Sequence, residues 1–198
     1  MFFSIAHVLL SIAENCKSIS IFSIHQAGHV FFGPTGKVNK SRVRVKVLAW
    51  FSKSGAGEIR LIKENFSAEE FLAFLDDMLL PEAWARFGLD PVPLLINPSP
   101  RFNLNSNSSV VRDWQTNHPE FKLERFSPKS YDINPFQEIW RYIEGSLRLQ
   151  RVQPKDAEEL WEGIEEIWDY RSQRPLFWQG LVDQFRANLT STITKKGN

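Results

Sequence analysis

The sequence contains little cysteine and no excess of charge of either sign. Its single cysteine, Cys16, excludes a disulfide within the chain and a metal centre built from several cysteines. Lys and Arg number 24 and Asp and Glu 23, for a net charge of +1. This balance excludes a general attraction to nucleic acid or to a membrane surface, so any basic surface must be local. Scarce cysteine fits a reducing compartment, and we expect a nuclear or intracellular protein.

Long hydrophobic runs are also missing. The N-terminal segment 1–17 is apolar, but it is shorter than the roughly 20 residues that cross a bilayer. It also lacks the basic start of a secretory signal. We therefore expect it to be a buried part of the domain and not a separate domain, with neither secretion nor membrane attachment.

Several motifs of known chemistry are absent. The sequence has no Gly-rich phosphate-binding loop and no nucleophile elbow, so nucleotide binding and serine-hydrolase chemistry have no support. The spacing of His25, His29, His118 and Cys16 matches no zinc motif. We expect these histidines to be ordinary structural residues, and we expect no resident metal or cofactor.

The sequence does contain enough hydrophobic residues to form a buried core. Hydrophobic residues make up 42% and aromatic residues 13% of 198 residues. That amount suits one domain, which we place at 18–150, with C-terminal helices at 151–198 packed on it. We expect most of the tryptophans to pack in the core, because they fall at helical core spacing.

The periodicity of the apolar residues predicts an antiparallel meander at the start. Alternating or apolar runs indicate strands over 18–24, 28–33, 42–51 and 57–62. A capping box at Ser67 and Glu70 then begins a helix, which Pro81 should end.

The second half alternates between helix and strand before it becomes helical. We predict a strand over 91–96, a helix over 108–117, a strand over 121–126 and helices over 134–149, 155–171 and 175–193. This order is that of the ribonuclease-H-like, retroviral-integrase-like α/β fold: a mixed sheet flanked by helices, with a helical C-terminal segment. Element order alone would leave it one α/β candidate among several.

Four ordered segments carry a more specific resemblance. They read "VKVLAWFSKSGAGEIRLI" (45–62), "FSAEEFLAFLDDMLLP" (66–81), "SPKSYDINPFQEIWRYIEGSLR" (127–148) and "LVDQFRANLTSTITKKGN" (181–198). Together they resemble the catalytic domain of mariner-type transposases of the DDE/D group. The resemblance implies DNA cleavage and strand transfer by two divalent ions, Mg²⁺ or Mn²⁺, held by three acids. The family also has an N-terminal DNA-binding region, for which residues 1–17 leave no room.

The positions that match the three family acids carry no acid. They are Ile24, Ile96 and Gln137, and no Asp or Glu occurs between Cys16 and Glu58. Two-metal catalysis needs carboxylates around ions about 3.5–4 Å apart, and Mg²⁺ requires hard oxygen ligands. The resemblance therefore predicts a catalytically inactive site with no metal bound.

Two nearby acids could be mistaken for the missing one. Asp132 matches a family residue that is not a metal ligand, and we expect it to cap the following helix. Glu138 is one position beyond Gln137, a step that rotates a helical side chain by about 100° away from the site.

Two charged segments suggest partners. A basic stretch without acids could contact DNA phosphates, with Arg101, Arg112 and Lys122 as extensions, or could simply be a solvated strand face. Its members are Lys37, Lys40, Arg42, Arg44 and Lys46. The acidic helix 156–170 would repel DNA and suits a protein partner. Its acids include Glu158, Glu159, Glu162, Glu165 and Glu166.

Three functions therefore stay open. The chain is an inactive transposase-derived domain that binds nucleic acid or protein, a divergent transposase or endonuclease with relocated metal ligands, or a decayed transposon copy without a selected role. Candidate ligands for the divergent enzyme are Asp132, Glu138, Asp113 and the pair Asp76 and Asp77.

Overall fold

The fold is built from five strands and a series of helices, seen in a computed structural model that describes residues 20–32, 38–62, 67–88, 92–97, 109–119, 121–125 and 134–196. Segment 1–17 lies outside the described residues. The strands are β1 (Ser20–Phe32), β2 (Val38–Ser52), β3 (Gly55–Ile62), β4 (Val92–Asn97) and β5 (Phe121–Arg125). The helices are α2 (Ala68–Phe74), the π-helical η1 (Leu75–Leu79), α3 (Leu80–Phe87), α4 (Ser109–Asn117), α5 (Phe136–Leu149), α6 (Ala157–Ser172) and α7 (Pro175–Lys196).

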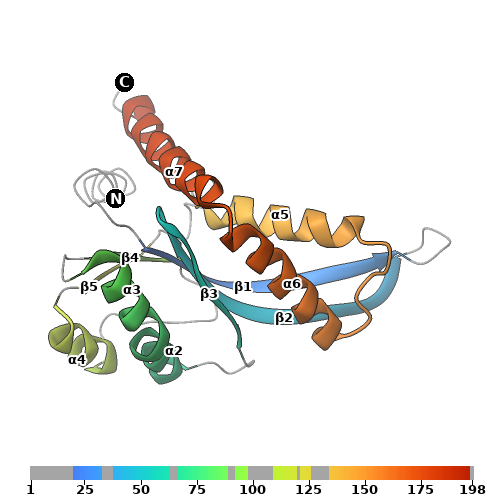
Figure 1. Cartoon of the computed structure of the whole chain (residues 1–198), viewed down its shortest axis with the longest axis horizontal. Coiled ribbons are helices and arrows are strands. Elements are labelled where there is room, and N and C mark those ends of the chain that lie inside the picture. The colour runs from blue at the N-terminus through green and yellow to red at the C-terminus, as the bar shows by residue number, and fades with distance from the viewer. Residues whose placement is uncertain are drawn as a thin grey trace.

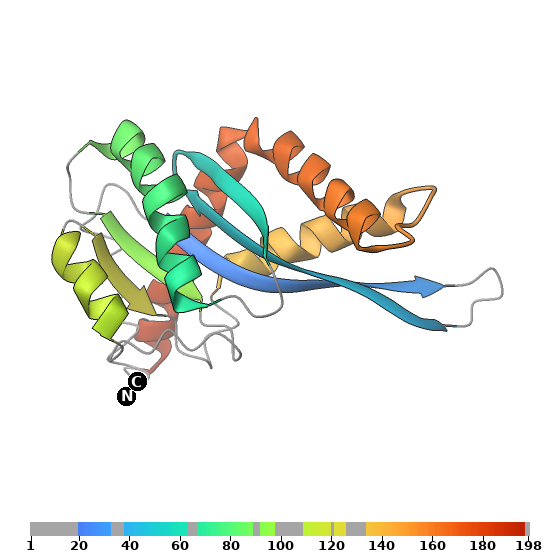
Figure 2. The ribbon, with the colours of Figure 1, turned by 90° about the horizontal axis from the view of Figure 1, so that it is seen from below.

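The strands form one mixed sheet in the order β3-β2-β1-β4-β5. β1, β2 and β3 run antiparallel to one another in sequence, whereas β4 pairs parallel with both β1 and β5. Helices α5, α6 and α7 cover one face, and α2, η1, α3 and α4 cover the other (Figures 1 and 2). This is the mixed, helix-flanked α/β sheet that the sequence predicts.

β2 separates the two cores because its side chains alternate between the faces of the sheet. Val47 and Phe51 are fully buried with α5, α6 and α7. Leu48 and Trp50 are fully buried with the α2–α4 layer. One strand therefore anchors both helical layers.

Aromatic rings join the C-terminal helices to the sheet. Phe51 contacts Phe136 of α5 and Trp178 of α7, with ring centroids 5.1 and 5.3 Å apart. Trp168 of α6 lies 5.2 Å from Trp178. The expectation that most tryptophans pack in the core is confirmed, since Trp114, Trp140, Trp168 and Trp178 are all buried.

β1 is one continuous strand, so the prediction of separate strands over 18–24 and 28–33 was wrong. It pairs with β2 from Ser20 opposite Ser52 to Phe32 opposite Val38. The intervening stretch 25–28 has no apolar alternation of its own. Pairing with a long neighbour satisfies its backbone groups, which decides the structure there.

The prediction that Pro81 ends the helix was also wrong. The helix continues to Phe87, and Pro81 is in the first turn of α3. Proline lacks an N–H and crowds the carbonyl four residues earlier. The preceding turn widens into a π-helix, in which the Leu80 N–H bonds to the Leu75 carbonyl oxygen, and this wider turn accommodates the ring.

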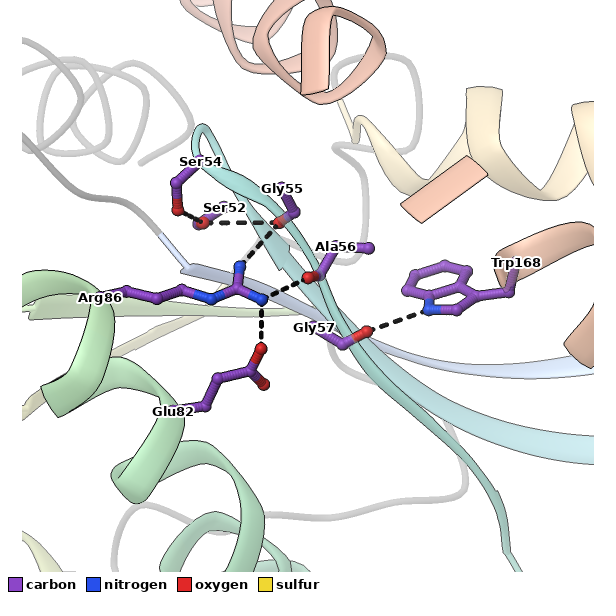
Figure 3. A network of polar contacts seen from close by, with 8 residues as sticks. All are labelled: Ser52, Ser54, Gly55, Ala56, Gly57, Glu82, Arg86 and Trp168. Atoms are coloured by element: carbon purple, nitrogen blue, oxygen red, sulfur yellow. Dashed lines mark hydrogen bonds and ion pairs between the residues drawn. The ribbon is translucent and has the colours of Figure 1, made fainter. Parts of the chain in front are cut away.

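A β-bulge shapes the edge strand β3. One residue of β2, Trp50, lies opposite two residues of β3, Gly57 and Glu58. A Cβ atom at Gly57 would lie 1.9 Å from the Trp50 ring, so only glycine permits this approach. The Gly57 carbonyl oxygen accepts a 3.0 Å hydrogen bond from Trp168 Nε1, which ties α6 to the edge (Figure 3).

Arg86 of α3 holds the same edge from the other layer. Its guanidinium donates to the carbonyl oxygens of Gly55 at 3.3 Å and Ala56 at 2.6 Å, and it pairs with Glu82 (Figure 3). It also lies 5.0 Å from the centre of the Trp50 ring. Side chains from both layers thus occupy the start of an edge strand that could otherwise pair with another chain.

Among the described residues, no helix is both long enough and apolar enough to cross a membrane.

Candidate functional site

Ile24 and Ile96, which match the first two acids of the family, lie on the neighbouring parallel strands β1 and β4. In the β1–β4 pairing, Phe22 is opposite Ile96 and Ser23 is opposite Asn97. Ile24 follows Ser23 directly, so the backbones of Ile24 and Ile96 are close together at the C-terminal end of β4. The sheet therefore brings together the first two positions that the resemblance selects, Ile24 and Ile96.

The start of α5 fixes the third position. The Asn134 side chain is buried, and its Oδ1 accepts a 3.1 Å hydrogen bond from the Phe136 N–H. The Asn134 carbonyl oxygen accepts a 3.0 Å bond from the Gln137 N–H. Asn134 thus satisfies the first helical N–H groups. Asp132, for which we predict this capping role, lies outside the described residues.

Gln137 lies on the first turn of α5, and α5 packs against β1. Both views show the start of this helix beside the first half of β1 (Figures 1 and 2). The elements that carry Ile24, Ile96 and Gln137 therefore meet at one end of the sheet.

A cavity of about 410 Å³ lies beside Gln137, between α5 and α7. Its walls include a 2.8 Å hydrogen bond from Gln184 Nε2 to Asn188 Oδ1. The lining residues are Asn134, Pro135, Gln137, Glu138, Arg141, Leu181, Gln184, Phe185 and Asn188. Four of these residues are amides, and Glu138 is the one acid among them.

Glu138 forms an exposed ion pair with Arg141, one turn further along α5. An exposed pair of this kind contributes little to stability. It nevertheless places a cation beside the carboxylate that follows Gln137 in the helix.

At the three positions Ile24, Ile96 and Gln137, the donor set does not fit a pair of divalent ions. Neither β1 nor β4 contains Asp or Glu, and none occurs between Asp90 and Asp113. Isoleucine offers no ligand, and glutamine offers only a neutral carbonyl oxygen. Within the described ranges, no three His, Cys, Asp or Glu residues could hold a metal ion together. That the protein binds no metal stays a prediction.

The other candidate ligands for the divergent enzyme, Asp76, Asp77 and Asp113, belong to the opposite helical layer. Asp76 of η1 accepts a 2.6 Å hydrogen bond from Trp114 Nε1 and lies 3.4 Å from His118 Nε2. Asp77 and Asp113 are exposed on η1 and α4. These residues are on the other face of the sheet from α5, so the structure does not bring them to Gln137. Asp76 and His118 join α4 to η1, a structural role as expected for His118.

The predicted basic residues separate into two groups. Lys40, Arg42, Arg44 and Lys46 all belong to β2. Arg112 is exposed on α4, and Lys122 is on β5 at the far edge of the sheet. Lys37 and Arg101 lie outside the described residues. The structure therefore does not bring α4 and β5 to the basic part of β2 (Figure 1).

The predicted acidic helix is α6. Asp156 caps it, since Asp156 Oδ1 accepts a 2.9 Å bond from the Glu159 N–H. Glu158, Glu162, Glu165 and Glu166 are exposed along it. These four acids therefore face solvent on this helix.

A second cavity, of about 420 Å³, lies between α6, α3 and the bulged edge of β3. Its acids are Glu58, Glu82, Glu165 and Asp169. Burial raises the pKa of Glu82, the Arg86 guanidinium lowers it in part, and the nearby Glu58 raises it further. This cavity is acidic, unlike the amide-rich cavity at α5.

Comparison with known proteins identifies the fold. No protein-family model matches the sequence, and no curated protein matches it. Among solved structures, the catalytic domain of Mos1 mariner transposase matches with a TM-score of 0.69 and 16% identity over 99% of this chain and 92% of that chain.

Larger Mos1 assemblies match equally well. A pre-cleavage Mos1 transpososome has a TM-score of 0.74 and 15% identity over 99% of this chain. The Mos1 strand transfer complex has a TM-score of 0.71 and 15% identity over 100% of this chain. In both, the match spans 61% of the Mos1 chain. The chain thus has the ribonuclease-H-like fold of the mariner transposase catalytic domain, which confirms the resemblance at the level of fold.

Proposed function

We propose that this protein is a transposase-derived domain that has lost two-metal catalysis and that binds DNA. One observation carries the proposal: the elements that hold Ile24, Ile96 and Gln137 converge at one end of the sheet, but none of these residues is a carboxylate. Without carboxylates, two divalent ions have no ligands, and the phosphoryl-transfer chemistry of the family has no means to proceed.

DNA as the partner is supported by the fold and by local charge. The structural neighbours include Mos1 in a transpososome and in a strand transfer complex. β2 supplies Lys40, Arg42, Arg44 and Lys46, with no acid among them. Phosphate contacts of this kind give binding that weakens as salt rises.

The test is a cleavage and binding experiment on the same preparation. Labelled duplex DNA is incubated with Mg²⁺ or Mn²⁺, and gel shifts are measured across a salt series. We expect no cleavage, and binding that weakens with salt. Cleavage that Asp132→Ala or Glu138→Ala abolishes would instead establish the divergent enzyme with relocated ligands. A well-folded protein that neither cleaves nor binds would favour a protein partner or a decayed copy.

A protein partner is the second candidate, and α6 favours it. Among the described residues, Glu158, Glu162 and Glu166 take part in no ion pair, and all are exposed. Such a row of like charges on one helix is mildly destabilising by itself. A basic protein surface would relieve this repulsion. Charge reversal at Glu162 and Glu166 should abolish capture of that partner and leave DNA binding intact.

A further inference from the structure

The outer parts of β1 and β2 form a two-stranded ribbon that extends beyond the rest of the sheet. Pairing of β3 with β2 stops at Lys46, opposite Ile62. Pairing of β4 with β1 covers only 20–23. Beyond these points, β1 and β2 pair only with each other among the described strands, as far as Phe32 opposite Val38. The ribbon is thus a protruding element and not part of the five-stranded body.

Among the described helices and strands, the cover of the ribbon lies on one side. Helices α5 and α6 lie along it on one side, whereas α2, α3 and α4 gather at the opposite end of the molecule (Figures 1 and 2). The acidic α6 belongs to the covered side. A polyanion would therefore approach the open side, away from the carboxylates of α6.

The ribbon carries basic residues and no acid. In β2, Lys40, Arg42, Arg44 and Lys46 occupy every second position. Arg42 is paired with Val30, and Arg44 with Gly28. β1 contains neither Asp nor Glu, so the paired strand brings no negative charge beside Arg42 or Arg44.

We propose that this ribbon enters the major groove of B-form DNA and that its cations contact the phosphates that border the groove. The inference rests on the proposed DNA-binding function and adds the contacting element and the form of the duplex. The major groove is about 12 Å wide and admits a two-stranded ribbon, whose strands are about 4.8 Å apart. The major groove of A-form RNA is too narrow and deep for side chains to read. The ribbon therefore selects duplex DNA over duplex RNA.

The experiment compares duplex DNA with duplex RNA of the same sequence. Fluorescence anisotropy is measured across a salt series for the natural protein, Arg42→Ala/Arg44→Ala and Arg42→Lys/Arg44→Lys. The control is Lys53→Ala/Arg174→Ala, which removes two cations at the end of β2 away from the ribbon and at the start of α7. In the alanine variant, the slope of log K against log salt should shrink by about 0.9 for each phosphate that is no longer neutralised. The lysine variant and the control should keep most of the slope.

A footprint on the natural protein provides a test that does not depend on any variant folding. Dimethyl sulfate methylates guanine N7, which lies in the major groove. We expect protection of N7 when the protein is bound. Equal affinity for DNA and RNA, or unprotected N7, would overturn the proposed entry of the ribbon into the major groove. Either result would leave the proposed DNA binding in place. Absence of binding to either duplex would overturn both the ribbon and the proposed function.

Discussion

At the scale of single residues, adding one methyl group at Gly57 should have a large effect on the stability of the fold. A Cβ atom there would lie 1.9 Å from the buried Trp50 ring. We expect Gly57→Ala to reduce the free energy of unfolding by about 1–3 kcal/mol, because the packed ring has little room to move. Urea unfolding monitored by tryptophan fluorescence measures this.

The matched control is Gly145→Ala on the exposed side of α5, where an added Cβ meets nothing within 4 Å. Alanine favours a helix by about 0.5–1 kcal/mol over glycine, so this variant should be more stable. Equal effects of the two substitutions would contradict the packing described around Trp50.

Glu82 gives the protein a dependence on pH. Burial raises its pKa from the ordinary value of 4.5, so the folded state binds a proton more readily than the unfolded state. The contribution of Glu82 to stability therefore falls as pH rises from about 4.5 through the folded-state pKa. We expect the stability of the natural protein relative to Glu82→Gln to be greater near pH 4.5 than near pH 7.

Chemical denaturation at both pH values measures this difference. Glu162→Gln, on the exposed side of α6, controls for the loss of one carboxylate. A relative stability that rises with pH would show that the ion pair with Arg86 outweighs burial.

At the scale of elements, the start of α5 depends on Asn134. Its buried side chain accepts the Phe136 N–H, and Phe136 packs on Phe51 of the sheet. We expect Asn134→Ala to cost about 0.5–2 kcal/mol of the free energy of unfolding, as loss of a helix-capping acceptor does. Asn134→Ser retains an acceptor and should recover part of the loss. Similar unfolding midpoints for the two variants would argue against this capping role.

Local patterns predicted most elements well. Helix α4, predicted over 108–117, runs over Ser109–Asn117, and β5, predicted over 121–126, runs over Phe121–Arg125. The errors arose where a neighbour overrides local preference. The middle of β1 follows β2, and the helix passes Pro81 through a π-turn. Neither feature has a signal within a short sequence window.

Contacts between distant residues could not be predicted at all. The hydrogen bond from Trp168 to the Gly57 carbonyl and the Arg86 contacts with the same strand join segments far apart in the chain. The sequence shows only that these residue types are present, and it does not show that they meet. By contrast, Ile24, Ile96 and Gln137 could be selected because motifs resembling the family surround them, and the sheet register then brings the first two together.

At the scale of the whole molecule, the fold should still be able to hold metal if acids are restored. We expect the triple variant Ile24→Asp/Ile96→Asp/Gln137→Asp to bind Mn²⁺, because the elements that carry these positions converge and carboxylates would supply the ligands. Binding to the folded state alone would raise the melting temperature as Mn²⁺ is added.

Mn²⁺ electron paramagnetic resonance measures the bound ion directly. The double variant Ile24→Asp/Ile96→Asp, which keeps Gln137, is the control and should bind more weakly. A folded triple variant that takes up no Mn²⁺ would refute the assigned positions.

The position of β1 at the centre of the sheet has a consequence for biosynthesis. β1, β2 and β3 are continuous in sequence and can pair as they leave the ribosome, whereas β4 follows only after α2 and α3. Until then, the part of the β1 edge that pairs with β4, Ser20–Ser23, is also open, and β1 carries no Lys, Arg, Asp or Glu to discourage pairing with other chains. We therefore expect an aggregation-prone stage during synthesis, before β4 is made. The soluble yield of the protein should then depend on the speed of translation and on chaperones.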